Sequence, residues 1–247
     1  MKKAILVVSF GTSYRDTLEK TIGSVERDFV EAFGYEVRRA FTSGMIINKL
    51  LSRDGIKTDT VEEALQRLID EGFEEAVCVV THIINGFEYD KVTKITDSFK
   101  DKIKISVTRP LVSLTEDYGD IIDALSGEFS KDKLYVLMGH GTEHFSNAVY
   151  PALRYHLGIR GLDNVYVGTV EGFPTLDDIM DEMKETDKKQ VVLMPFMLVA
   201  GDHANNDMVE WKEKLSDAGF EAECVMKGLG EYKSVRDIYI KRASEFI

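Results

Sequence analysis

Cysteines are scarce in this 247-residue chain, which contains only Cys78 and Cys224. Each lies in an apolar run and no CxxC spacing is present, so the sequence indicates buried free thiols, not a disulfide framework or a zinc knuckle. Long hydrophobic runs are absent as well. Because no apolar stretch approaches the roughly 20 residues of a membrane-spanning helix, we expect no membrane segment.

Basic residues are outnumbered, with 31 Lys and Arg against 43 Asp and Glu and a formal net charge of −12. Nucleic acids and anionic membranes are bound by clustered Lys and Arg, so neither is expected as a partner. The apolar run 4–8 follows two lysines, but it is too short for a signal peptide and lacks a small-residue cleavage site. We therefore expect a cytoplasmic protein.

Nucleotide-binding motifs are also missing. The loop 9–13 (SFGTS) has the look of a phosphate-binding turn, but it contains neither GxGxxG nor GxxxxGK[ST]. Those motifs place glycine amides and a lysine around phosphates. The sequence therefore gives only weak support for nucleotide binding.

Apolar runs alternate with amphipathic segments along the whole chain, which predicts parallel sheets flanked by helices. The expected fold is α/β, with two similar lobes at 1–128 and 129–247. The sequence leaves open whether the last helix packs on the first lobe. Predicted strands are 4–9, 35–41, 76–84, 103–108, 134–138, 165–170, 190–199 and 221–226; predicted helices are 14–33, 45–52, 60–71, 89–99, 146–157, 175–184, 207–218 and 234–246.

The two halves resemble each other. Residues 4–12 align with 134–142, which pairs Phe10 with His140; residues 76–85 align with 191–200, which pairs Glu88 with His203. The two registers differ by about fifteen residues, and the segment 45–57 fills that gap. A duplicated α/β protein carries ligand-binding loops at the carboxyl ends of its strands, so we expect an active-site cleft between the lobes.

His140 is the most conspicuous residue because it stands between Gly139 and Gly141 at the end of the apolar run 134–138. In open α/β sheets, ligands bind at this edge. Flanking glycines allow a sharp turn and leave the imidazole accessible. The alternative is a histidine that is merely packed at a strand end.

Four loops together resemble those of the anaerobic sirohydrochlorin cobaltochelatases, which are class II chelatases related to ferrochelatase. The loops are 9–12 (SFGT), 81–90 (THIINGFEYD), 138–142 (MGHGT) and 195–208 (PFMLVAGDHANNDM). The resemblance implies a lyase of cobalamin and porphyrin biosynthesis that inserts Co²⁺ into sirohydrochlorin, a precorrin-2-type ring, and releases two protons. It implies no organic cofactor and Co²⁺ as the substrate metal. Ligand chemistry leaves Fe²⁺, Ni²⁺ or Zn²⁺ open as alternative metals in vitro.

The same resemblance implies that His140 and His203 bind the metal and that Glu88 is the acidic residue facing them. The chemistry agrees, because neutral imidazole is a suitable ligand for Co, Ni, Fe and Zn. Two imidazoles and one carboxylate leave positions open for water and then for pyrrole nitrogen. A carboxylate can also accept a pyrrole proton. We therefore predict His140, His203 and Glu88 as metal-binding and catalytic residues.

Substrate-binding residues are less clear from the sequence. Sirohydrochlorin carries several carboxylates, which call for cations, hydroxyls or helix N-termini. Ser13, Tyr14 and Arg15, which follow the first strand, are the predicted contacts. Lys91 and Arg154 are further candidates at what look like helix starts, with a solvated helix residue as the alternative for each.

Phe10 and Met197 are also predicted substrate contacts. Met138, Met194 and Met197 lie at strand ends and are typical of a core, although an apolar surface beneath a flat ring would be made of such residues. His82 is either a core histidine or a participant, and His144 is expected at a helix start or lining the cleft. Asn205–Asp207 are expected to cap the helix that follows them.

Other functions remain open at this point. A protein that stores or ferries metal or tetrapyrrole would use the same residues without turnover, and a chelatase for Fe²⁺ or Ni²⁺ would share the ligands. Strand and helix alternation alone is equally typical of a flavodoxin-like or periplasmic-binding-like module. The sequence leaves a homo-oligomer open.

Overall fold

The computed structural model describes residues 2–247, apart from the side chains of residues 202–205. It contains two compact units: unit 1 comprises Met1–Ser113 with Gly230–Ile247, and unit 2 comprises Leu114–Leu229. The predicted division into lobes after residue 128 stays a prediction. Within the part of the chain described here, no helix has the length and apolar composition needed to cross a bilayer.

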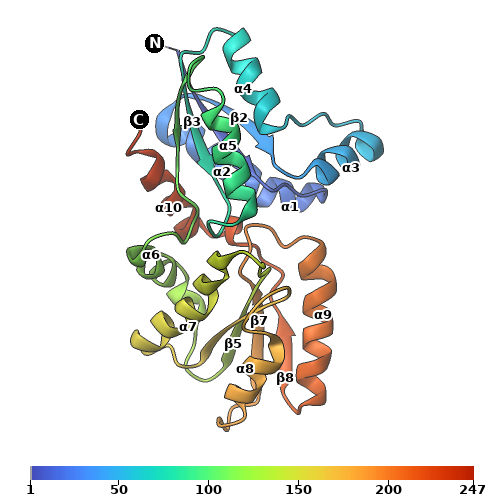
Figure 1. Cartoon of the computed structure of the whole chain (residues 1–247). Helices are drawn as coiled ribbons and strands as arrows, with labels where there is room; N and C mark the ends of the chain where they lie inside the picture. The colour runs from blue at the N-terminus through green and yellow to red at the C-terminus, as the bar shows by residue number, and fades with distance from the viewer. Residues whose placement is uncertain (1) are drawn as a thin grey trace. The chain divides into compact units, whose positions relative to one another are not determined.

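Unit 1 is built on a four-stranded parallel sheet in the order β2-β1-β3-β4 (Figure 1). The strands are β1 Lys3–Ser9, β2 Glu36–Phe41, β3 Glu75–Val80 and β4 Lys104–Val107. The two central strands are almost entirely buried, because helices cover both faces of the sheet. This is the usual reason why strands of parallel sheets read as continuous apolar runs.

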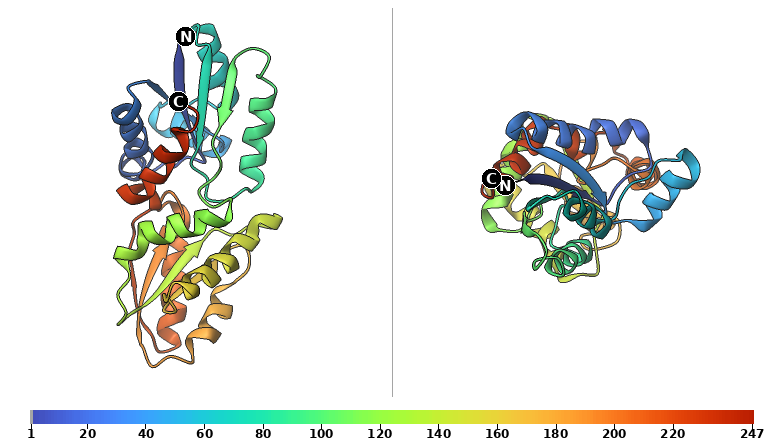
Figure 2. Two further views of the ribbon diagram at one scale, coloured as in Figure 1. Left: turned by 90° about the vertical axis from the view of Figure 1, so that its left-hand side faces the viewer. Right: turned by 90° about the horizontal axis from the view of Figure 1, so that it is seen from above.

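Helices α4 (Val61–Asp70) and α5 (Phe87–Asp97) pack on one face of this sheet, against alternate residues of β1 and β3. Helices α2 (Ile22–Phe33) and α10 (Lys233–Ala243) contact each other and lie on the opposite face (Figure 2). The other helices of unit 1 are α1 Arg15–Lys20, α3 Gly44–Asp54 and the 3₁₀ turn η3, which spans the unit boundary at Leu229–Glu231. The last helix therefore packs with the first strands of the chain.

Unit 2 repeats this plan with the order β6-β5-β7-β8. Its strands are β5 Leu134–Gly139, β6 Val165–Thr169, β7 Gln190–Pro195 and β8 Glu221–Cys224. Helices α8 and α9 contribute Ile179, Trp211 and Leu215 to a core shared with β5 and β7. The helical elements of unit 2 are α6 Thr115–Leu125, η1 Ser126–Glu128, η2 Phe145–Ala148, α7 Val149–Ile159, α8 Leu176–Met183 and α9 Asp202–Asp217.

The predicted α/β class is confirmed, and so is the helix start at Thr60, whose hydroxyl accepts a hydrogen bond from the Glu63 amide as part of a capping box.

The predicted helix 14–33 is in fact two helices. Thr21 interrupts it with φ −108° and ψ −86°, while its hydroxyl donates to the Thr17 carbonyl at 2.6 Å. A side-chain bond of this kind competes with regular helix geometry.

Two further predictions were wrong at the site-bearing end of unit 2. Strand β7 ends at Pro195 and not at residue 199, because proline has no N–H to continue the ladder. Helix α9 begins at Asp202, directly after Gly201. Asn206 and Asp207 therefore lie inside the helix and do not cap it.

The predicted pairing of Phe10 with His140 is confirmed by matching backbone contacts in the two units. The Phe10 carbonyl accepts from the Ser43 amide at 3.3 Å, and the His140 carbonyl accepts from the Glu171 amide at 2.8 Å. Ser43 follows β2, which pairs with β1, and Glu171 follows β6, which pairs with β5. Residues 10 and 140 therefore occupy equivalent positions in the two units.

Candidate functional site

His140 leaves the carboxyl edge of the unit 2 sheet through a turn that only glycines allow. Gly139 is the last residue of β5, and a Cβ there would lie 2.3 Å from the Tyr150 ring. Gly141 has φ +82°, and a Cβ there would lie 2.6 Å from the backbone nitrogen of Gly172. The turn is therefore sterically determined, and the His140 side chain keeps 42% of its surface exposed.

The His140 ring is oriented by its Nδ1 atom, which lies 3.0 Å from the Gly141 carbonyl oxygen. A carbonyl can only accept, so Nδ1 carries the proton and the lone pair of the neutral ring is on Nε2. Metal-binding histidines are typically held in this way, with the second ring nitrogen donating to a carbonyl or carboxylate. In a neutral His140, Nε2 is therefore the ring nitrogen whose lone pair suits a metal.

Glu171 is a site residue that the sequence analysis missed. Its Oε2 atom lies 3.7 Å from His140 Nδ1, and its backbone amide donates to the His140 carbonyl. It follows the predicted strand 165–170, and this strand-end position was the available signal. The sequence did not indicate that β6 pairs with β5, which is what brings the two side chains together.

The loop after His140 is tied down by its own side chains. Asn147 accepts from the Thr142 amide at 3.1 Å and donates to the Phe173 carbonyl at 2.7 Å. His144 Nδ1 accepts from the Ser146 amide at 3.2 Å, so this lone pair caps η2. The prediction that His144 marks a helix start is confirmed.

His203 is the second residue of α9, but its side chain lies outside the described residues. Met197 is half-buried in the segment between β7 and α9. Within either unit, no three of the described His, Cys, Asp and Glu side chains are placed to hold a metal ion together. The full ligand set therefore stays a prediction.

Glu88 is the second residue of α5 and lies at the carboxyl edge of the unit 1 sheet. Its Oε2 atom is buried and has no hydrogen-bond partner among the described residues. Leaving a carboxylate oxygen buried without a donor is unfavourable. Such an atom is typical of a group that meets a ligand, a metal or a proton.

His82 lies on the loop that leads into α5, six residues before Glu88. Its Nε2 atom is 3.4 Å from the Thr42 hydroxyl, and Lys91 donates to the Thr42 carbonyl at 2.7 Å. Its Nδ1 atom is buried and has no hydrogen-bond partner in the described part of the chain. Burial, together with the Lys91 charge, lowers the pKa of His82 to about 4. His82 is therefore neutral at pH 7.

This lowered pKa predicts acid sensitivity. Between pH 6.5 and 4 the unfolded chain protonates His82 while the folded protein does not, so folding stability falls as the pH falls through this window. At about 1.4 kcal/mol per pKa unit, the loss is of the order of 1–3 kcal/mol. Urea unfolding of wild type and His82→Asn at pH 7 and pH 4.5 measures it. We expect a smaller pH-dependent loss in the variant; equal losses would contradict the prediction.

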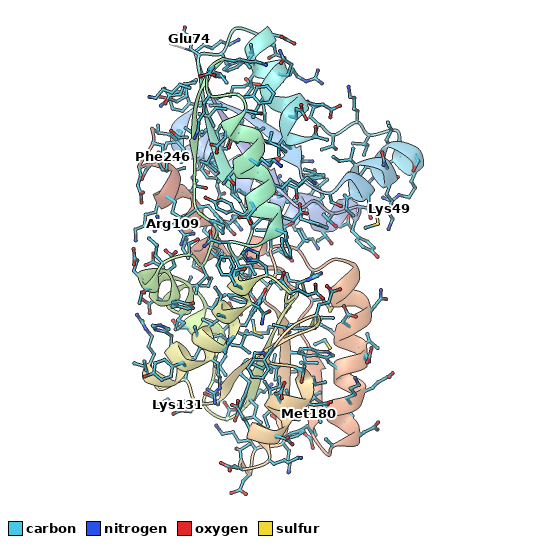
Figure 3. The ribbon with its side chains drawn as sticks, in the orientation of Figure 1. Lys49, Glu74, Arg109, Lys131, Met180 and Phe246 are labelled. Carbon is cyan, nitrogen blue, oxygen red and sulfur yellow. The ribbon has the colours of Figure 1, made fainter. Side chains whose placement is uncertain are left out.

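The predicted substrate contacts near the end of β1 are engaged within unit 1. Ser13 is buried, and its carbonyl accepts from the Arg53 guanidinium. Arg15 lies 3.5 Å from Asp54, which also pairs with Arg53. Tyr14 is exposed. The ammonium of Lys49 lies 5.9 Å from the centroid of the Tyr14 ring; Lys49 is labelled on α3 in Figure 3. Arg15 therefore shares its charge with an internal carboxylate.

Exposed aromatic residues gather beside these loops in both units. Phe10, a predicted substrate contact, is exposed, and Phe87 follows the N-cap of α5 with 61% of its surface exposed. In unit 2, Phe145 is 84% exposed, and Phe173 is exposed next to Asn147. Large exposed aromatics of this kind mark contact surfaces for apolar or planar ligands. The sequence analysis identified only Phe10.

Arg154, in contrast, does not lie near His140. It sits in the middle of α7, 3.3 Å from Glu182, with its guanidinium 4.5 Å from the Tyr166 ring centroid. These side chains line a polar depression of about 460 Å³ together with Leu134, the first residue of β5. This is the amino edge of the sheet, where Lys131 is labelled in Figure 3. Arg154 was a candidate substrate contact at a helix start, and that placement was wrong, because Arg154 lies in the middle of α7 and at the amino edge of the sheet.

Comparison with known sequences gives consistent results. The cobalt chelatase (CbiK) family matches residues 3–247. The sirohydrochlorin cobaltochelatase of Salmonella typhimurium is 40% identical over 250 residues, covering 97% of this chain and 94% of that protein. The sirohydrochlorin cobaltochelatase CbiKC of Nitratidesulfovibrio vulgaris is 34% identical over 253 residues, covering 97% of this chain and 88% of that protein.

Solved structures share the fold at low sequence identity. The structure of SirB from Bacillus subtilis with Fe³⁺ superposes with a TM-score of 0.72 at 14% identity, covering 99% of this chain and 95% of that chain. This similarity supports the chelatase fold alone. On the family match and the two full-length relatives, the chain belongs to the CbiK cobalt chelatase family.

Proposed function

We propose that this protein inserts Co²⁺ into sirohydrochlorin with the release of two protons, the activity for which its two curated relatives are named. The observation that carries the proposal is His140 itself, which is held between two obligatory glycines and hydrogen-bonded through Nδ1. That arrangement directs Nε2 toward a metal. The proposed reaction uses the metal and the macrocycle as substrates and needs no organic cofactor.

In this proposal His140 binds Co²⁺ through Nε2, and Glu171 orients the ring and offsets the metal charge. His203 is the second imidazole by family resemblance. A site with few protein ligands leaves positions at which water departs and pyrrole nitrogens enter, whereas a closed site with four ligands would trap the ion. The protein therefore has to hold the metal only transiently.

The two pyrrole protons need an acceptor. Glu88 is the proposed acceptor of each proton in turn, passing the first to solvent before it takes the second, because its buried Oε2 has no hydrogen-bond partner among the described residues. The exposed rings of Phe10 and Phe87 offer apolar contact for a planar macrocycle in unit 1, as Phe145 and Phe173 do in unit 2. Ser13, Tyr14, Arg15 and Met197 remain proposed substrate contacts.

The test is a turnover assay with purified protein, sirohydrochlorin and Co²⁺, followed by the change in the absorbance spectrum of the ring. We expect many ring equivalents metallated per protein molecule, faster than in protein-free solution. One equivalent or less would instead indicate a carrier protein. Parallel reactions with Fe²⁺, Ni²⁺ or Zn²⁺, and with protoporphyrin in place of sirohydrochlorin, define the metal and ring preference.

Glu171→Gln tests the carboxylate beside His140. The substitution keeps the size of the side chain but removes the charge that favours the metal-bound form, so we expect kcat/KM for Co²⁺ to fall about tenfold. Glu182→Gln is the matched control in the same unit, since Glu182 pairs with Arg154 at the amino edge of the sheet. Equal kinetics for the two variants would rule out a role for Glu171 at the metal.

A further inference from the structure

Helix α10 buries two polar side chains against the unit 1 sheet. Tyr239 is 1% exposed and Arg242 is 2% exposed, although both lie on the last helix of the chain. Burying a guanidinium is unfavourable unless its donors are satisfied, and apolar residues would fill the same space at lower cost. These two side chains therefore call for an explanation beyond packing.

Both side chains donate to backbone carbonyls at the carboxyl edge of the sheet. The Tyr239 hydroxyl donates to the Thr81 carbonyl at 3.1 Å, immediately after β3. The Arg242 guanidinium donates to the carbonyls of Leu111, at 2.7 Å, and Pro110, in the segment after β4. One helix thus holds the exits of two neighbouring strands.

The segment after β4 in turn holds the loop that leads to Glu88. The Leu111 amide donates to the His82 carbonyl at 2.9 Å, and the Val112 amide donates to the Ile83 carbonyl at 2.8 Å. The Ser113 hydroxyl lies 3.3 Å from the Asn85 side-chain oxygen. The contacts therefore run without a break from α10 to loop 81–86, and this loop enters α5 at its N-cap Gly86.

We propose that Tyr239 and Arg242 are positioning residues, which fix loop 81–86 and thereby the direction of the Glu88 carboxylate. The inference rests on the proposed role of Glu88 as proton acceptor. It assigns a function in the reaction to helix α10, which is distant in sequence from the residues it contacts. Tyr239 and Thr81 are 158 positions apart, and Arg242 and Leu111 are 131 positions apart.

Tyr239→Phe tests this inference, because it removes one hydroxyl and keeps the ring. We expect amide hydrogen exchange at Leu111, Val112 and Gly86, whose N–H groups donate to the carbonyls of His82, Ile83 and Ile84, to become about fivefold faster, as for the loss of one hydrogen bond. We expect kcat to fall about threefold to tenfold with KM for Co²⁺ unchanged, because the proton acceptor is misplaced while metal binding is retained.

The matched control is Tyr135→Phe, which removes another buried hydroxyl, one that bonds to Ser130 at the amino end of β5. It should lower the melting temperature by a similar amount without changing kcat or the exchange of the Leu111, Val112 and Gly86 amides. Equal effects of Tyr239→Phe and Tyr135→Phe on kcat and on exchange would overturn the proposal. Arg242→Lys keeps the charge but cannot donate to both carbonyls at once, so it should also speed exchange at the Leu111 and Val112 amides.

A double variant separates this inference from the proposed function. If Tyr239 acts through Glu88, adding Tyr239→Phe to Glu88→Gln should change kcat by less than about twofold. An undiminished loss of kcat in that background would overturn the positioning role. If Glu88→Gln alone leaves kcat unchanged, Glu88 is not the proton acceptor. Faster amide exchange in Tyr239→Phe would then still show that α10 stabilises the loop.

Discussion

His140→Ala should lower kcat/KM for Co²⁺ insertion about 10²- to 10⁴-fold, the range for loss of a positioned acid–base or ligand group. The variant removes the imidazole whose Nε2 is the proposed metal ligand. Folding should be preserved, because the side chain is 42% exposed and contributes little to the core. Steady-state kinetics with sirohydrochlorin, together with a thermal melt, measure both effects.

His156→Ala is the matched control for that experiment. His156 lies on α7 and stacks on Tyr118 with a centroid distance of 4.4 Å, so the change removes an imidazole from unit 2 without touching the His140 loop. We expect near-normal kinetics and a small loss of stability. If His140→Ala retained insertion within about threefold of wild type while His156→Ala did the same, His140 would not be the metal ligand.

Gly141→Ala should be almost as damaging, although no functional group is lost. Alanine is strained at φ +82°, and its Cβ would lie 2.6 Å from the Gly172 nitrogen and 2.9 Å from the Glu171 carbonyl carbon. The backbone would have to move where His140 and Glu171 meet. We expect kcat/KM to fall at least about 100-fold, as for a misplacement of roughly 1 Å, and stability to fall by about 3 kcal/mol or more.

Gly161→Ala separates strain from crowding. Gly161 also has a positive φ, +72°, but a Cβ there meets nothing within 4 Å. This variant should lose only about 1 kcal/mol of stability, from the left-handed backbone conformation alone, and should keep its activity. Denaturant unfolding and kinetics on both variants make the comparison. Similar activity losses in the two would show that general destabilisation, and not the His140 turn, is responsible.

The α/β class could be predicted from the sequence because the signals that determine it are local. Continuous apolar runs such as 4–8 and 134–138 report strands that are buried on both faces, and the amphipathic segments between them report the covering helices. Gly141 belongs to the same category, since the ability to adopt a positive φ is a property of glycine itself. The pairing of Phe10 with His140 could be predicted as well, because two copies of one fold keep the same strand ends.

The sequence by itself thus determined the alternation of strands and helices, the repeat of the two halves, and the prominence of His140. Only the tertiary structure decided that β6 lies beside β5, which places Glu171 next to His140, and that α10 returns to hold the loop before Glu88. Strand order and the docking of a terminal helix depend on contacts between residues distant in the chain. No periodicity within a short segment encodes them.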